Sequence, residues 1–231
     1  MPVTRYHLAL AGLALLATSC EKEKLESCPG HCTVVTGRLL TSGQQPLTDA
    51  PVSAAWITRG GILGNKARTK ARTTTDANGY YQLSFYAQDE ELADGYFNVA
   101  YEVDKTRYYV IGDGEGLLDV RRDTTYQLPP YLIPRKAAVR LTVPNADQIQ
   151  GYFAVEFGSA YGRSLVVTRG LGGGPVFSAP RQGTPYTNSA EVAGDQKLYM
   201  QVLRSNNGTT TRTLDSLVIP AGTTRDITVR Y

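Results

Sequence analysis

Three carboxylates lie close together in one glycine-rich stretch of the sequence. They are Asp113, Glu115 and Asp119, within the segment Gly112-Asp113-Gly114-Glu115-Gly116-Leu117-Leu118-Asp119. Two carboxylates can hydrolyse a glycosidic bond, one as the acid and the other as the base or nucleophile. Three hard oxygen ligands can instead bind calcium. We favour a third interpretation, a solvated loop between two strands, because so short a motif is weakly specific.

The chain has few histidines that could take part in catalysis. The sequence holds two histidines, His7 and His31, and both precede the first predicted strand. A Ser-His-Asp or Cys-His mechanism needs a histidine in the domain that carries out the reaction. We therefore expect no catalytic residue, no cofactor and no enzymatic activity.

The first nineteen residues have the pattern of an export signal. Arg5 is followed by an apolar run from Leu8 to Ala17 and by the small residues Thr18 and Ser19. The run is too short for a membrane-spanning helix, which needs about 20 apolar residues. The segment is therefore predicted to be a cleaved signal peptide.

The residues around the expected cleavage point resemble the lipobox of bacterial lipoproteins. Ala17-Thr18-Ser19 precedes Cys20, although Leu16 lies one position further from the cysteine than the usual leucine does. The resemblance implies that residues 1–19 are removed and that Cys20 carries the lipid, so that the membrane is the first expected partner. An ordinary signal followed by an incidental cysteine is the alternative. The charged stretch at 21–26 suits a solvated tether and resembles signals that direct lipoproteins to the outer membrane, on its periplasmic face or at the cell surface.

Lipidation of Cys20 would leave two cysteines, Cys28 and Cys32, separated by Pro29, Gly30 and His31. In an oxidising compartment we expect these two to form a disulfide that closes a small loop. Cys28, His31 and Cys32 could also bind zinc, but the exported chain has no fourth cysteine or histidine to complete a tetrahedron. We assign residues 20–32 to the lipidated cysteine and its tether.

The rest of the sequence reads as short strands. Apolar residues alternate with polar ones, which is typical of strands with one buried face. The alternating positions are Tyr81, Leu83 and Phe85; Phe97, Val99, Tyr101 and Val103; Val139, Leu141 and Val143; Phe153, Val155 and Phe157; Leu198, Met200 and Val202; and Ile227, Val229 and Tyr231. Pro129, Pro130 and Pro134 mark a boundary, because proline lacks the amide that a central strand needs. We predict an all-β fold with two antiparallel β-sandwich domains in tandem, at residues 33–134 and 135–231.

The first predicted domain resembles the carboxypeptidase regulatory-like family of transthyretin-like sandwiches. The resemblance covers about residues 33–86: an opening strand at 33–40, then Gln45-Pro46-Leu47, a strand at 50–54, and Thr73-Thr74-Thr75-Asp76-Ala77-Asn78-Gly79-Tyr80-Tyr81-Gln82-Leu83. It implies a seven-stranded, non-catalytic accessory module. The chain departs from the family by a basic loop expected from Arg59 to Arg72, and residues 135–231 belong to no family that their sequence identifies.

Charge and aromatic content bear on the partner. The net charge is only +3 and the basic residues are scattered, so we expect no nucleic-acid partner. Tyr80, Tyr86, Tyr152 and Tyr199 are predicted to face outward, where they could stack on a glycan or contact an outer-membrane protein; tyrosine also simply suits strand surfaces. The leading hypothesis is a non-catalytic, anchored binding or scaffolding module. The alternatives are a carboxylate-dependent glycan hydrolase and an assembly subunit that pairs through a sheet edge.

Overall fold

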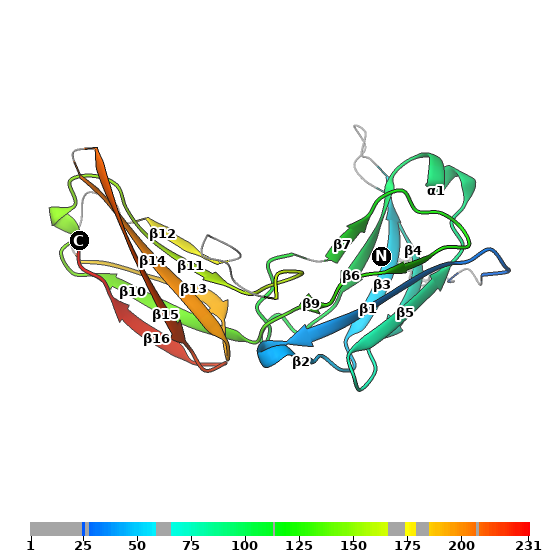
Figure 1. Cartoon of the computed structure of the whole chain (residues 1–231), viewed down its shortest axis with the longest axis horizontal. Helices are drawn as coiled ribbons and strands as arrows, with labels where there is room; N and C mark the ends of the chain where they lie inside the picture. Colours follow the sequence, from blue (N-terminus) through cyan, green and yellow to red (C-terminus); the bar gives the residue numbers. More distant parts are fainter. Residues whose placement is uncertain are drawn as a thin grey trace, which may run out of the picture.

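The computed structural model describes residue 25 and residues 28–58, 66–112, 114–165, 174–178, 185–206 and 208–231. It consists of two β-sandwiches arranged end to end (Figure 1). The prediction of an all-β fold is confirmed. None of the helices in the described segments has the length and apolar character needed to cross a bilayer.

The first sandwich packs two sheets around one core. Its strands are β1 (Thr33–Thr41), β2 (Gln45–Pro46), β3 (Pro51–Ile57), β4 (Ala67–Thr74), β5 (Tyr80–Phe85), β6 (Tyr96–Tyr101), β7 (Gly114–Leu117), β8 (Thr125–Gln127) and β9 (Tyr131–Leu132). In the five-stranded sheet β1 lies between β5 on one side and β8 and β9 on the other, with β2 paired to its end. The four-stranded sheet has the order β4-β3-β6-β7. The short helices η1 (Ser42–Gln44) and α1 (Asp89–Ala93) belong to this domain.

The second sandwich repeats this strand order. Its elements are β10 (Lys136–Val143), η2 (Ala146–Gln148), β11 (Phe153–Ser159), β12 (Val176–Ser178), β13 (Tyr186–Ala193), β14 (Lys197–Asn206), β15 (Thr209–Val218) and β16 (Thr224–Thr228). The sheets have the orders β13-β10-β16 and β12-β11-β14-β15. Each strand pairing of the second domain has its counterpart in the first domain. The second half of the chain therefore has the same topology as the first half.

The sandwiches are not purely antiparallel, which corrects one part of the fold prediction. The last strands of each domain run parallel to its first strand: β8 and β9 beside β1, and β16 beside β10. All other strand pairings in the described residues are antiparallel. Period-two patterning does not distinguish these cases, because side chains alternate in the same way in parallel and antiparallel strands.

Strand β5 shows how local sequence sets the fold. Tyr81, Leu83 and Phe85 are buried, while the residues between them are exposed. The preceding turn is held by Asp76, whose Oδ1 accepts hydrogen bonds from two backbone amides, those of Asn78 and Tyr80. Gly79 has φ 78°, and a Cβ there would collide with the Leu39 carbonyl. The turn at residues 76–79 and the register of β5 against β1 therefore depend on each other.

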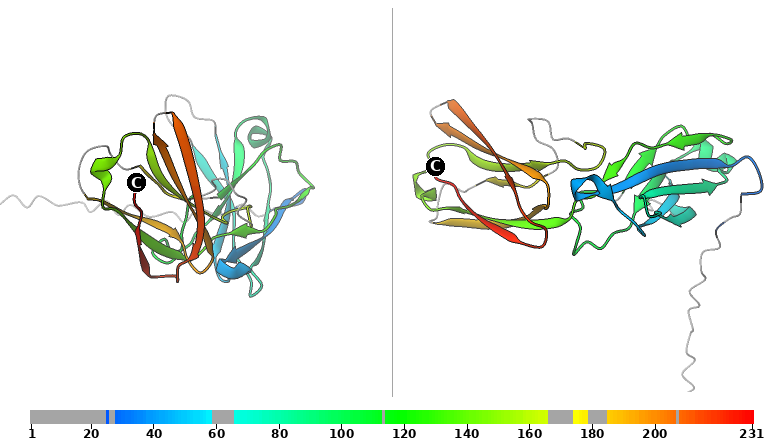
Figure 2. Two further views of the ribbon diagram at one scale, coloured as in Figure 1. Left: turned by 60° about the vertical axis from the view of Figure 1, so that its left-hand side comes forward. Right: turned by 60° about the horizontal axis from the view of Figure 1, so that its bottom comes forward.

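The domains meet where β1 ends. One apolar cluster extends from Val35 to Ile133 and the other from Ala137 to Val229. β1 begins at Thr33, directly after Cys32, and runs for nine residues, about 30 Å, to the joint beside Ser42. The described chain therefore enters the first domain at the end opposite the second domain, as the turned views in Figure 2 show.

One end of the first sandwich carries a charged cluster that the sequence analysis missed. β4 begins at Ala67, so the expected loop from Arg59 to Arg72 ends earlier than predicted; residues 59–65 lie outside the described residues. Lys70 on β4 is buried, and its Nζ lies 3.0 Å from the carboxylate of Glu91 in α1. Glu91 also accepts a hydrogen bond from Arg68 and closes the capping box of α1.

Candidate functional site

The candidate anchor and the disulfide lie at the start of the chain. Cys20 falls outside the described residues. Cys28 and Cys32 are joined by a disulfide whose Cα atoms are 5.9 Å apart. His31 does not turn towards these cysteines but contacts Asp123, in the segment before β8. This contact links the segment before β1 to the segment before β8.

The three carboxylates do not form a described metal site. Asp113 lies outside the described residues, and no group of three metal-ligating side chains occurs among those described. Glu115 is on β7 and points into the domain, whereas Asp119 is exposed with φ 55° in the segment after β7. β7 ends at Leu117, so Asp119 lies beyond the strand that holds Glu115. The expected loop around Glu115 is a strand.

Glu115 is instead part of the joint between the domains. Its carboxylate is bound by the guanidinium of Arg163, from the second domain, and accepts a hydrogen bond from the hydroxyl of Tyr101 at 3.2 Å. The side chain of Glu115 is 4% exposed. The hydrogen bond to Glu115 raises the pKa of Arg163. Both described partners of this carboxylate thus belong to the joint and its surroundings.

Backbone hydrogen bonds join the two domains around this ion pair. Leu132 and Gly162 exchange two such bonds, both 2.8 Å long. The hydroxyl of Ser42 donates to the carbonyl of Gly194 and accepts from the amide of Arg135. Contacts of this kind fix the orientation of one domain on the other, because each group would be left without its partner if the joint opened.

Tyrosine rings fill the space beside the joint. The rings of Tyr101 and Tyr131 are 4.8 Å apart, and Tyr161 of the second domain packs edge-on against Tyr131 and Tyr109. Burial raises the pKa of Tyr81 to about 12 and that of Tyr109 to about 12. It also raises the pKa of Tyr101 and Tyr131. Burial in the cluster therefore favours the neutral form of these phenols.

The four tyrosines predicted to face outward do not share one surface. Tyr80 and Tyr86 lie at opposite ends of the outer face of β5, whereas Tyr152 precedes β11 and Tyr199 is on β14. Tyr80 is 53% exposed and Tyr152 is 50% exposed. Tyr86 and Tyr199 are half-buried, beside Arg122 and Lys197 respectively. A single aromatic platform is therefore not formed.

A groove of about 530 Å³ lies next to one of these tyrosines. Its lining comes from β1, β4, β5 and β8 and the segments after β4 and β8. The lining side chains on the outer face of the five-stranded sheet are Thr36, Arg38, Tyr80, Gln82 and Gln127. The sequence could have indicated the outward positions on β5 from their alternation, but not the partners that β1 and β8 bring beside them.

Comparison with known proteins gives general similarity of fold only. No protein-family model matches the chain, and no curated protein matches it. Among solved structures, the chain is similar to the shaft pilin SpaA of Lactobacillus rhamnosus GG, with 11% identity over 86% of this chain and 97% of the pilin, at a TM-score of 0.31. A streptococcal ancillary pilin has 11% identity over 88% of this chain and 63% of the pilin, at a TM-score of 0.34.

The Bacillus anthracis TIE protein is a third structure of this kind. It has 12% identity over 87% of this chain, at a TM-score of 0.31, and the match spans about a third of the TIE protein's own length (33%). With such identities and with TM-scores below 0.5, none of the three similarities carries an argument about function.

Proposed function

We propose that this protein is a non-catalytic lipoprotein that holds two rigidly joined β-sandwiches at a bacterial outer membrane, where they bind or scaffold a partner. The observation that carries the proposal is the course of β1. The tether leads into one end of the first domain, and β1 ends at the joint on the other end. A lipid on Cys20 would thus place the second domain furthest from the bilayer.

The joint supports this role because it makes the two domains one body. Glu115 and Arg163 pair across it, and Leu132 and Gly162 extend the backbone hydrogen bonding from one domain to the other. A rigid spacer delivers a binding surface at a fixed distance from its anchor. A glycan hydrolase of the usual kind needs two carboxyl groups that face one bound substrate, whereas Glu115 is paired with Arg163 inside the joint.

Anchoring is tested by labelling cells that express the full chain with radioactive palmitate. The wild-type protein is expected to incorporate label and to partition with membranes, and Cys20→Ala to lose both properties. Cys28→Ala is the matched control, because it removes a cysteine eight positions away and should leave the label in place. An unlabelled, freely soluble wild-type protein would refute the anchor. Turnover of glycan or peptide substrates by the purified protein would refute the non-catalytic role.

Assembly through a sheet edge is a second candidate function, favoured by β15. This ten-residue strand pairs only with β14 among the described residues, and nearly all of its side chains are exposed. An edge of this length can accept a strand from a partner protein. Crosslinking on intact cells, followed by capture in mild detergent, should recover a stable complex; a lone monomer would count against this candidate.

A further inference from the structure

The groove beside Tyr80 lies on the outer face of the five-stranded sheet of the first domain. The strand registers place its polar residues in rows. Thr36 pairs with Gln82 on β5 and with Gln127 on β8. Because neighbouring strands are about 4.8 Å apart, the backbones of the two glutamines are about 10 Å apart, with Thr36 between them. Arg38 and Tyr80 form the next row, two residues along β1.

The side chains of the middle row have free hydrogen-bonding capacity. Gln82 and Gln127 are exposed, and no hydrogen bond between described residues uses either side chain or the hydroxyl of Thr36. Each glutamine side chain has an NH2 group that donates hydrogen bonds and a carbonyl oxygen that accepts them. The threonine hydroxyl can also donate and accept. The row can therefore bind a ligand whose own groups both donate and accept, as hydroxyl groups do.

The row that follows adds a ring and a fixed cation. The guanidinium of Arg38 lies 5.0 Å from the centre of the Tyr80 ring, and its Nε donates to the carbonyl of Asn78 at 2.9 Å. These contacts hold both side chains in place before any ligand arrives. Asp76, which also lines the groove, balances the charge of Arg38, and its Oδ1 accepts two hydrogen bonds within the turn. The groove as a whole favours an uncharged ligand.

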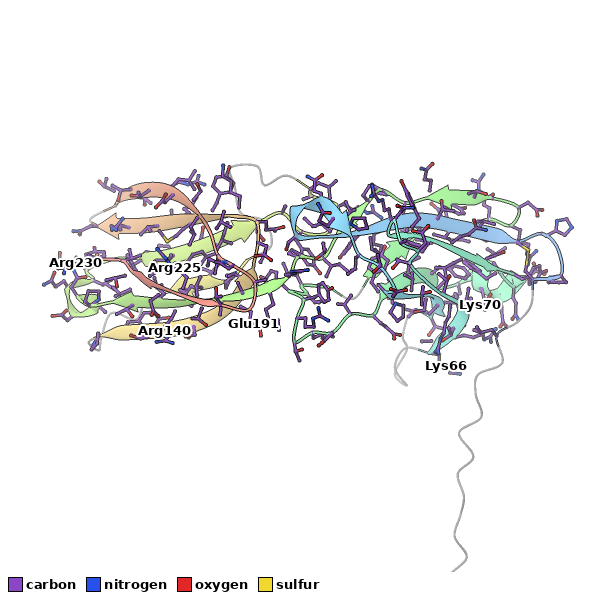
Figure 3. The ribbon with its side chains drawn as sticks, turned by 90° about the horizontal axis from the view of Figure 1, so that it is seen from below. Lys66, Lys70, Arg140, Glu191, Arg225 and Arg230 are labelled. Carbon is purple, nitrogen blue, oxygen red and sulfur yellow. A yellow bond between two sulfur atoms is a disulfide. The ribbon has the colours of Figure 1, made fainter. Side chains whose placement is uncertain are left out.

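The equivalent face of the second domain is different in chemistry. There the sheet β13-β10-β16 carries charged side chains that pair with each other, Lys136 with Glu191 at 2.8 Å and Arg140 with Asp226 at 3.5 Å. Figure 3 shows Arg140 and Glu191 on that sheet. The same face of the same topology is thus closed by ion pairs in one domain and left with unpaired amides in the other.

We propose that the groove formed by Thr36, Arg38, Tyr80, Gln82 and Gln127 binds a neutral glycan. The amide and hydroxyl groups of the middle row would bind sugar hydroxyls. The part of the Tyr80 ring that Arg38 leaves exposed would contact an apolar sugar face. A peptide strand is not the occupant, because β1 is flanked by β5 and β8, so its backbone is already paired on both sides. This inference rests on the proposed binding function and names its ligand class.

The test is binding of the purified full chain, in mild detergent, to an array of neutral and acidic hexasaccharides and of unstructured peptides, followed by calorimetry with the bound sugars. Binding of at least one neutral hexasaccharide is expected. Tyr80→Ala and the double variant Gln82→Ala/Gln127→Ala should each weaken it by about tenfold. Tyr152→Ala is the matched control, since Tyr152 is equally exposed but lies on the second domain, and it should bind as the wild type does.

Three outcomes would overturn the proposal. They are the absence of any neutral sugar bound, binding of peptides alone, and sugar binding that is equal in the wild type and in both groove variants. An unchanged urea midpoint, followed by the fluorescence of Trp56, would show that the variants are folded. Cys20→Ala should bind sugar as the wild type does, so failure of the lipid anchor and failure of the glycan site are separate results.

Discussion

The two domains share one strand order but protect their sheets differently. In the first domain, the long edge strand β4 carries Arg68, Lys70 and Arg72 and has a bulge opposite Ala54 and Ala55, while the other edge, β7, has four residues. In the second domain the long edge is β15, which pairs with β14 over ten residues without a register shift. Charge, bulges and shortness are the usual means of blocking an edge. β15 is neither bulged nor short, and its charged side chains are limited to Arg212 and Asp215. The same topology therefore serves a closed domain next to the tether and an open one beyond the joint.

The charged cluster of the first domain gives the largest expected effect. Glu91→Gln keeps the size of the side chain and a capping-box residue but removes a buried negative charge. We expect the first domain to lose about 3 kcal/mol in its free energy of unfolding, because the buried ammonium of Lys70 would lose its ion pair with Glu91. The measurement is urea unfolding followed by the fluorescence of Trp56, the single tryptophan, which lies in the first domain.

Glu90→Gln is the control for this experiment. Glu90 pairs with Arg68 at 3.2 Å, but its side chain is 62% exposed, so we expect a change below about 0.5 kcal/mol. Equal losses in the two variants would show that the burial of Lys70 is not what makes the cluster important.

The joint between the two domains gives the next largest expected effect. Arg163→Ala would leave the buried carboxylate of Glu115 with the Tyr101 hydroxyl as its remaining described partner. Because Arg163 is itself half-exposed, we expect a loss of about 1–2 kcal/mol. The urea midpoint of the Trp56 fluorescence transition should fall, and far-ultraviolet circular dichroism should show the second domain unfolding in a separate transition. Arg212→Ala, on exposed β15, should leave both signals unchanged; coincident transitions in Arg163→Ala would contradict a coupling role.

Alkaline pH is expected to act on the first domain through its buried phenols. In the unfolded chain tyrosine ionises near pH 10, whereas burial raises the pKa of Tyr81 and Tyr109 to about 12. The stabilisation is therefore complete below about pH 10 and is lost as the pH rises from there towards 12. Trp56 fluorescence should report unfolding in this range, together with a late rise in tyrosinate absorbance. Ionisation of every tyrosine near pH 10 in the still-folded protein would contradict this prediction.

The sequence predicts the strands better than it predicts what they bring together. Alternation identified the buried face of β5 and of β10, because a side chain's face depends only on its own strand. Alternation does not explain Glu156, which lies between the apolar positions Val155 and Phe157 on β11 and yet is buried, with Gln201 of β14 donating a hydrogen bond to it at 2.7 Å. The same limit applies to Glu115 and to the groove. Arg163 is 48 residues from Glu115, and Gln127 is 45 residues from Gln82, so only strand pairing places them together.

The open edge of β15 gives the smallest effect on folding and the sharpest test of the comparison. Asn206 and Thr209 flank a two-residue connection, so they form a hydrogen-bonded pair, and the amides of alternate residues from Thr210 to Val218 point away from β14. Leu214, at the middle of this row, is 41% exposed. We expect Leu214→Lys to change the free energy of unfolding by less than about 0.5 kcal/mol but to reduce concentration-dependent association in sedimentation velocity. Thr74→Lys, at the already basic edge β4, should leave association as it is. If the wild type stays monomeric at every concentration, or if both variants behave alike, β15 is no more open to a partner strand than β4, and the two domains do not differ in the way their edges indicate.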